Sequence, residues 1–395
     1  MTVLAGCATG SSGRPPATAV GYDASRAAKY AVSAETSGGV LEAFSAAEAT
    51  EAEITLQCLL PTALAYPETI RAPMDELHAF MQSIAVVAGP PRPRADLVAE
   101  VERGHRAVAN VAWWNPDPSD ATDALQAAID SGAQAVFVPS RGSPWQIRPI
   151  ELRGDLVLVF EEGAELVAKQ GAYLKRNATM FSVADASRIL IWGYGATVRM
   201  RKEDYSSWPY AESEYRHALR FRSVSELGIY GIQVQDAGGD GIYIGRSRDG
   251  RAYSENVVIR DVDLESGNRQ GLSVVSARRV LIEDSTFSNT KGTLPQAGID
   301  FEPNRPDEYL EDIVVRSSVF FGNRGAGIQF FLWNMTEDSP PISVRIENSE
   351  LRRNLVDFYV ARAGGTPTGH IEVVDSRMGW RRWVSTPPGL EVVYE

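Results

Sequence analysis

The chain has 395 residues, 44% of them hydrophobic and 23% charged, and its formal net charge is −12. This composition is ordinary for a globular protein, and the acidic balance argues against a nucleic-acid binder held by phosphate contacts. No apolar run approaches the length of a membrane-spanning helix, and the two cysteines, Cys7 and Cys58, offer neither a metal-ligand spacing nor a disulfide framework.

Residues 1–55 differ in composition from the rest of the chain. They are rich in Ala, Ser, Gly and Glu, which predicts a loosely packed linker. Cys7 lies in the tetrapeptide Leu-Ala-Gly-Cys, which resembles the lipobox of bacterial lipoproteins, although the basic and long apolar regions of an export signal are missing. A lipoprotein N-terminus and a chance match both remain open. The first implies an extracytoplasmic location: secreted, periplasmic or lipid-anchored.

Residues 56–110 are predicted to form a short helical extension that docks without contributing to a binding groove. The stretch APMDELHAFMQSIAVV has apolar residues at helical spacing, GPPRPR then interrupts the chain, and a second helical stretch follows. A further helix is predicted at 119–131, where Gly132 ends it and the β-strand AVFVP follows at once. This helix is expected to cap the domain at 111–395.

Short apolar-alternating strands repeat through the rest of the chain at a period of about 23–30 residues. A second family of strands lies between these segments, with almost no helical pattern. Two alternating strand types at such a period indicate a solenoid, an all-β fold of stacked rungs, with about ten rungs between residue 135 and the C-terminus. The aligned segments of the first family are HALRFR (217–222), DGIYIG (240–245), QGLSVV (270–275), AGIDFE (297–302), AGIQFF (326–331) and VDFYVA (356–361).

The helix before the first rung, the opening VFVP…PIEL…LVFEEGAEL and the GDGIYIG-type rungs resemble the pectin-lyase-like superfamily of right-handed parallel β-helices. The resemblance covers about residues 110–395. It implies that fold and a carbohydrate-directed function, since members include polysaccharide lyases, polygalacturonase-type hydrolases, uronate epimerases and phage tailspikes. None of the hydrolase signature motifs is intact. Asp240, in Gly-Asp-Gly, falls roughly where the hydrolases carry Asn-Thr-Asp-Gly.

Stacking of the aligned strands predicts which side chains share a face. Aligned residues of neighbouring rungs lie about 4.8 Å apart. One outward column is nearly bare, and we interpret it as the floor of a groove for an extended ligand, with tight rung geometry as the alternative. That column is Ala218, Gly241, Gly271, Gly298 and Gly327, and the column beside it is Arg220, Tyr243, Ser273, Asp300, Gln329 and Tyr359.

Asp300 and Glu302 are the predicted catalytic pair, with Asp240 as a reserve member. The two residues are two positions apart on a strand, so their carboxylates point to the same face, with Cα atoms about 6.5–7 Å apart. Glycoside hydrolysis uses two carboxyl groups in different protonation states, and neighbouring carboxylates divide in this way. The alternative is a solvated acidic face, or pairing with Arg269 and Arg305.

Six residues are predicted to contact substrate. Arg269 and His217 flank the carboxylates, as a partner for an anionic sugar group and as a proton carrier, and loop aromatics are expected to stack on sugar rings. Recurrent asparagines at the rung turns, Asn268, Asn289, Asn323 and Asn354, are interpreted as a structural ladder. The predicted contacts are Arg269, His217, Tyr243, Gln329, Trp333 and Arg220.

Three function classes remain open on this sequence. The first, favoured by the carboxylates, is a glycoside hydrolase that needs no cofactor. The second is a lyase or C5-epimerase on a uronic-acid polymer, with a base drawn from Arg269, Arg246, Lys291, Tyr243 or His217 and with calcium as a candidate cation. The third is a non-catalytic glycan-binding solenoid. The expected partner is a polysaccharide or oligosaccharide, with no nucleic acid and no transmembrane segment, and the oligomeric state stays open.

Overall fold

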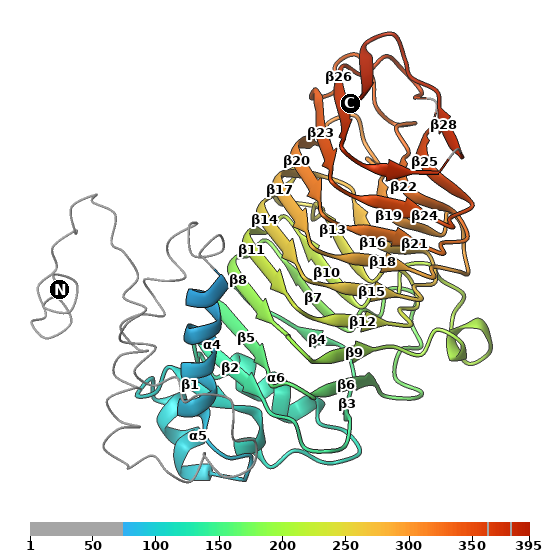
Figure 1. Cartoon of the computed structure of the whole chain (residues 1–395). Coiled ribbons are helices and arrows are strands. Elements are labelled where there is room, and N and C mark those ends of the chain that lie inside the picture. Colours follow the sequence, from blue (N-terminus) through green and yellow to red (C-terminus); the bar gives the residue numbers. More distant parts are fainter. Residues whose placement is uncertain (1–73, 362, 380) are drawn as a thin grey trace, which may run out of the picture.

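The computed structural model describes residues 74–361, 363–379 and 381–395, and its β-strands form three parallel sheets that wind along one axis (Figure 1). The predicted parallel solenoid is therefore confirmed. The sequence-based interpretations of residues 1–73, including the Cys7 motif, lie outside the described residues. Within the described residues, no helix is long and apolar enough to cross a membrane.

The three sheets take their strands in turn as the chain winds, so sequence neighbours lie in different sheets. The β1–β29 sheet contains β1 (Val108–Asn110), β2 (Ala135–Val138), β5 (Leu156–Phe160), β8 (Ser187–Trp192), β11 (Ser225–Tyr230), β14 (Ser254–Arg260), β17 (Ala277–Glu283), β20 (Leu310–Arg316), β23 (Ile342–Glu347), β26 (Gly369–Val374) and β29 (Leu390–Tyr394). The β3–β27 sheet contains β3 (Trp145–Ile147), β6 (Glu165–Ala168), β9 (Thr197–Arg199), β12 (Gln233–Gln235), β15 (Asp263–Glu265), β18 (Thr286–Ser288), β21 (Val319–Phe321), β24 (Glu350–Arg352) and β27 (Arg377–Met378). The β4–β28 sheet contains β4 (Ile150–Glu151), β7 (Phe181–Ala184), β10 (Leu219–Arg222), β13 (Ile242–Gly245), β16 (Gln270–Val274), β19 (Ala297–Phe301), β22 (Ala326–Phe330), β25 (Val356–Val360) and β28 (Arg382–Val384).

Inward side chains of the aligned strands form apolar ladders, as the strand alignment predicts. Ile242 pairs in register with Leu272, and Leu272 pairs with Ile299. All three are fully buried. The aromatic ladder Phe301–Phe330 stacks with ring centroids 4.6 Å apart. Burial of this continuous core holds neighbouring rungs together, since no rung buries its apolar face alone.

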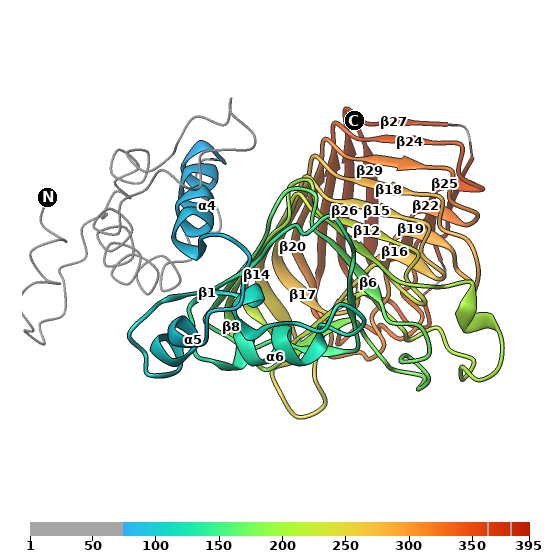
Figure 2. The ribbon, with the colours of Figure 1, turned by 90° about the horizontal axis from the view of Figure 1, so that it is seen from below.

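Helices cover one end and one side of the coil (Figure 2). The helix α6 (Thr122–Asp130) lies within the predicted 119–131 segment, and Leu125 and Ile129 enter the main core. The helix α4 (Met74–Ala88) packs Leu77 and Ile84 against the outer face of the β1–β29 sheet. A second short helix, α5 (Ala95–Glu102), follows α4, and two 3₁₀ turns are η3 (Val111–Trp114) and η4 (Asp204–Ser206).

The glycine column is a packing feature, and its interpretation as an open groove floor is wrong. A Cβ atom on Gly241 would lie 2.7 Å from the carbonyl oxygen of Gly271, and a Cβ on Gly298 would lie 2.6 Å from that of Gly327. The space beside each glycine is therefore filled by the backbone of the next rung. Glycine is required at these positions because the carbonyl oxygen of the next rung lies too close to where a Cβ atom would be.

The asparagine ladder exists at the turns before β22 and β25. Asn323 donates from Nδ2 to the Phe287 carbonyl oxygen (3.0 Å) and to Asn354 Oδ1 (2.9 Å). Asn354 Nδ2 donates in turn to the Phe320 carbonyl oxygen. The other two asparagines depart from this pattern, because Asn268 donates to Thr293 and Asn289 to Glu265.

A single methyl group should reveal the tight packing of the glycine column. We expect Gly298→Ala to lower the free energy of unfolding by about 1–3 kcal/mol, because its Cβ meets backbone that cannot move alone. The matched control is Gly245→Ala on the same sheet, whose Cβ meets the ring of Tyr243 at 2.9 Å, a side chain that can shift. Urea denaturation measures both variants, and equal losses would contradict the assignment.

Candidate active site

The candidate site lies on the outward face of the β4–β28 sheet. The predicted column is confirmed, because Arg220 pairs in register with Tyr243, Tyr243 with Ser273, Ser273 with Asp300, and Asp300 with Gln329. Four strand spacings of about 4.8 Å thus separate Arg220 from Gln329 along the coil axis. Side chains from separate rungs are held at fixed intervals on a rigid surface.

Asp300 and Glu302 differ in their exposure to solvent. Asp300 is 0% exposed, whereas the Glu302 side chain is 18% exposed. The expectation that both carboxylates face a groove is therefore wrong for Asp300. The reason lies one strand earlier, where the buried Gln270 donates from Nε2 to Asp300 Oδ2 at 2.5 Å. Asp300 Oδ1 is also buried and has no hydrogen-bond partner within the described residues.

One arginine is the positive centre of the site. Arg269 Nη2 lies 2.5 Å from Glu302 Oε2, its Nε lies 3.5 Å from Glu214 Oε2, and its Nη1 lies 3.8 Å from Asp240 Oδ1. Pairing of Glu302 with Arg269 was the alternative to a catalytic role, and this ion pair is present. The other arginine considered, Arg305, donates its backbone N–H to Glu308.

Negative groups outnumber the single positive charge of Arg269. Burial raises the pKa of Asp300 well above its ordinary value, and the negative charges of Glu302 and Asp240 raise it further. The positive charge of Arg269 offsets only part of this rise. For Arg269 itself, burial opposes the charged form, but the charges of Asp240 and Glu302 outweigh burial and raise its pKa. Asp300 is thus favoured as the protonated acid beside a permanently charged arginine.

A chain of polar side chains joins the two buried carboxyl groups. Ser273 Oγ lies 2.7 Å from Asp240 Oδ2 and 2.6 Å from Gln270 Oε1, and Gln270 continues the chain to Asp300. A hydroxyl carries one hydrogen, so Ser273 donates to only one of its two acceptors at a time. The path Asp240–Ser273–Gln270–Asp300 therefore links the reserve carboxylate to the predicted pair.

His217 lies at the end of this path and is buried, with 3% of its surface exposed. The backbone N–H of Asp240 donates to His217 Nδ1 at 3.1 Å, and Asp240 Oδ2 lies 3.2 Å from the same nitrogen. The first contact uses Nδ1 as an acceptor, whereas a hydrogen bond to the carboxylate would need a proton on the same nitrogen, so the two contacts belong to different protonation states of the ring. The ring stacks on Tyr243 with centroids 5.0 Å apart.

The other predicted contacts differ in accessibility. Gln329 is 8% exposed and Trp333 is 58% exposed, so Trp333 is the more accessible of the two. Among the loop aromatics, Trp208 is also exposed. Tyr205 is buried beside Arg216, and Tyr253 packs edge-on against Tyr309, so these rings have local packing roles.

Sequence reasoning did not assign roles to Glu214, Gln270 or Ser273. Glu214 belongs to the long connection between β9 and β10, whose path no repeat register predicts. The aligned rungs did contain a signal for Gln270. His217, Asp240 and Gln270 each come directly before a residue of the glycine column, so they occupy one position of the repeat. Aligned side chains of one column are the ones that stacked rungs bring together.

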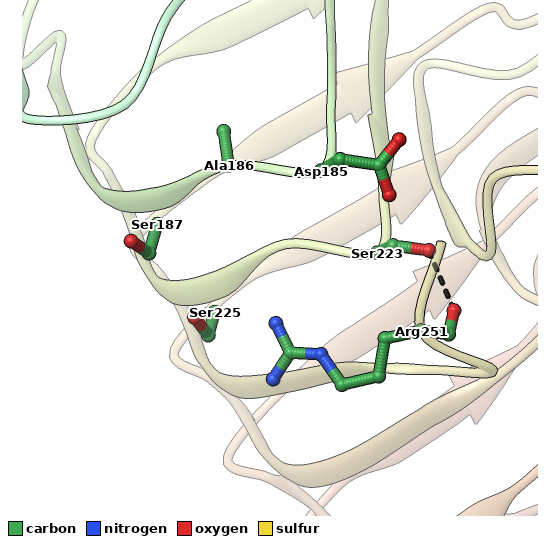
Figure 3. Close-up of a pocket in the computed structure, with 6 residues that line it drawn as sticks. All are labelled: Asp185, Ala186, Ser187, Ser223, Ser225 and Arg251. Atoms are coloured by element: carbon green, nitrogen blue, oxygen red, sulfur yellow. Dashed lines mark hydrogen bonds between the residues drawn. The ribbon is translucent and has the colours of Figure 1, made fainter. Parts of the chain in front are cut away.

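A separate hollow of about 270 Å³ lies where β7, β10 and β13 turn toward the β1–β29 sheet (Figure 3). Its lining is polar, and Ser223 Oγ donates to the carbonyl oxygen of Arg251 there. Within the described residues, no three His, Cys, Asp or Glu side chains are arranged to hold a metal ion. The lining residues are Asp185, Ala186, Ser187, Ser223, Ser225 and Arg251.

Comparison with known proteins assigns the fold. The model of the family described as "right handed beta helix region" matches residues 212–355. The chain is a right-handed parallel β-helix of the pectin-lyase-like fold. No curated protein matches the chain in sequence.

Two solved structures have a similar fold. An exopolygalacturonase from Thermotoga maritima superimposes with a TM-score of 0.50 at 12% identity, over 71% of this chain and 77% of that one. The tailspike protein of Escherichia coli bacteriophage HK620, in complex with a hexasaccharide, superimposes with a TM-score of 0.50 at 13% identity, over 85% of this chain and 61% of that one. At these identities the likeness concerns the fold alone.

The protonated state of Asp300 should appear in the pH dependence of stability. A carboxyl group whose folded-state pKa is raised contributes stability below its ordinary pKa and loses it as the pH rises through the folded value. We expect the free energy of unfolding of the wild type to fall relative to Asp300→Asn between pH 5 and pH 8. Each unit of pKa elevation is worth about 1.4 kcal/mol.

The matched control for this comparison is Asp307→Asn. The bond from Arg246 lowers the pKa of Asp307, so its carboxyl is ionised throughout this range and the difference from wild type should stay constant. Urea denaturation at several pH values supplies both curves. Parallel curves for the wild type and Asp300→Asn would show that Asp300 is ionised in the folded protein.

Proposed function

We propose that the protein is a glycoside hydrolase that cleaves a polysaccharide or oligosaccharide on the outward face of the β4–β28 sheet. The observation that carries the proposal is the unequal state of two adjacent carboxyl groups. Asp300 is fully buried with a raised pKa, whereas Glu302 is partly exposed and paired with Arg269. Glycosidic bond cleavage requires one carboxyl group as acid and a second as base or nucleophile.

Glu302 is the member of the pair that reaches solvent, and we assign it the contact with the sugar ring. Its partner is Asp300 or Glu214. Burial favours the proton that an acid needs on Asp300, but the side chain is fully buried, so a sugar reaches it only after the side chains around it move. Glu214 also lies beside Arg269 and is more exposed, with 31% of its side chain accessible to solvent. Asp240 remains the reserve carboxylate, because the hydrogen-bonded path through Ser273 and Gln270 connects it to Asp300.

The lyase or epimerase alternative needs a base that removes a C5 proton, and three of the five candidate groups suit this role less well. Burial, together with the charges of Glu308 and Asp240, raises the pKa of Tyr243 to about 12, so the phenol keeps its proton at neutral pH. Arg269 has a raised pKa. Arg246 is paired with Asp307 at 2.7 Å. Carbohydrate handling by both solved relatives, as their names state, is consistent with either enzyme class and with the glycan-binding alternative.

Amide substitutions separate these roles. We expect Glu302→Gln to lower the turnover rate by about 10²–10⁴-fold, the usual contribution of an acid or base. A loss of similar size in Glu214→Gln would identify Glu214 as the partner, whereas unchanged turnover there with a loss in Asp300→Asn would identify Asp300. Glu337→Gln, an exposed residue of the β22–β23 loop, is the matched control and should keep wild-type turnover.

The assay follows reducing-sugar release and ultraviolet absorbance together on a panel of neutral, uronate-containing and sulfated polysaccharides. Hydrolysis gives reducing ends without absorbance, whereas a lyase gives both signals. Asp300→Asn should also change the pH–rate profile, since the wild type acquires a second negative charge beside Glu302 as Asp300 ionises. Wild-type turnover in Glu302→Gln, or unsaturated products from the wild type, would overturn the proposal.

A further inference from the structure

Two arginines on β10 point outward on the same face as the carboxylates. Arg220 and Arg222 are two residues apart on one strand, which places both side chains on one side of the sheet. Three strand spacings, about 14 Å, separate Arg220 from Asp300 along the coil axis. The proposed hydrolase site does not use this pair for its chemistry.

Neither guanidinium has a partner among the described residues. Among the described residues, the side chains of Arg220 and Arg222 form no hydrogen bond and no ion pair. Both Nε atoms are buried without a hydrogen-bond acceptor. Other arginines of the same region are paired, as Arg246 is with Asp307 and Arg251 with Glu255. Both arginines of the pair are half-buried.

This arrangement is unfavourable for the protein alone. Burial lowers the pKa of Arg220, and the like charge of Arg222 lowers it further. The nearby carboxylate of Glu151 only partly offsets these effects, and its Oε1 accepts a hydrogen bond from Ser182 at 2.8 Å. Burying cationic groups without partners destabilises a folded chain, so an anion from outside would satisfy groups that the fold leaves unpaired.

The surroundings leave room for such an anion. The register neighbours of Arg222 are Ala184 and Gly245, and one neighbour of Arg220 is Ser182. On its other side Arg220 neighbours Tyr243, whose ring lies over Gly245. The polar hollow of Figure 3 begins one residue further along both strands, where Asp185 follows β7 and Ser223 follows β10. Hydroxyl groups of a sugar have hydrogen-bonding partners there.

We propose that Arg220 and Arg222 form a subsite for an anionic group, a carboxylate or a sulfate, carried by the sugar chain that the hydrolase site cleaves. The inference rests on the proposed function, since it names the class of its substrate. Guanidinium groups bind carboxylate and sulfate oxygens through two parallel N–H bonds, and Arg220 and Arg222 offer two such groups side by side.

The test is affinity electrophoresis of the full chain through gels that contain polygalacturonate, a sulfated galactan or a neutral galactan. We expect the wild type to be retarded by one or both anionic polymers and not by the neutral one, and the two anionic gels distinguish carboxylate from sulfate. Arg220→Gln and Arg222→Gln should each weaken that binding about tenfold or more, as expected for a lost charge-assisted hydrogen bond. Arg324→Gln, an exposed arginine before β22, is the charge-matched control and should bind as the wild type does.

Thermal unfolding separates a binding role from a structural one. Because the two arginines are unpaired and repel each other, the glutamine variants should keep or exceed the wild-type Tm. A lowered Tm in both variants would indicate a structural role and overturn the subsite, as would wild-type binding by both variants or absence of retardation in either anionic gel.

Cleavage assays distinguish this inference from the proposed function. Arginine-dependent binding to an anionic polymer without cleavage of that polymer would sustain the subsite and remove the hydrolase. Cleavage of an anionic polymer at equal rates by the wild type and both arginine variants, with equal retardation, would sustain the hydrolase and remove the subsite.

Discussion

In-register stacking of the rungs is the constraint on which the site depends. Each strand of the β4–β28 sheet pairs residue for residue with the next, and the glycine column lets neighbouring backbones approach until a Cβ would lie within 2.7 Å of a carbonyl oxygen. This close approach fixes the interval between outward side chains. The site can therefore take Arg269, Asp300 and Glu302 from different positions in the sequence and hold them together on a rigid surface.

An excess of carboxyl groups over positive charge around Arg269 determines the chemistry of this surface. One guanidinium, that of Arg269, lies among the carboxyl groups of Glu214, Asp240 and Glu302, with Asp300 beneath them. A single positive charge cannot stabilise four negative ones in a region of low dielectric, and burial together with the charges of Glu302 and Asp240 favours the proton on Asp300. The same face carries unpaired positive charge at Arg220 and Arg222. Free guanidiniums and carboxylates three strand spacings apart on one face are compatible with an extended, charged ligand.

The periodicity of the sequence predicted the fold and the strand register because rung stacking is a local, repeated property. The column from Arg220 to Gln329 and the inward ladders followed from the alignment alone. The exposure of Asp300 did not, since it depends on the packing around its side chain, which includes the hydrogen bond from Gln270 of the preceding rung. Glu214 could not be found either, because it reaches Arg269 from a long connection outside the repeat. The glycines illustrate a third limit: their register was predicted, but only the backbone geometry shows that the next rung fills the space beside them.

The most direct measurement is a crystal structure of the Glu302→Gln variant soaked with an oligosaccharide of the anionic polymer that retards the wild type most strongly. The account predicts ordered sugar along the outward face of the β4–β28 sheet, with one ring beside the substituted side chain and an acidic group within hydrogen-bonding distance of Arg220 or Arg222. Ordered sugar on either of the other two sheets, with this face empty, would contradict it.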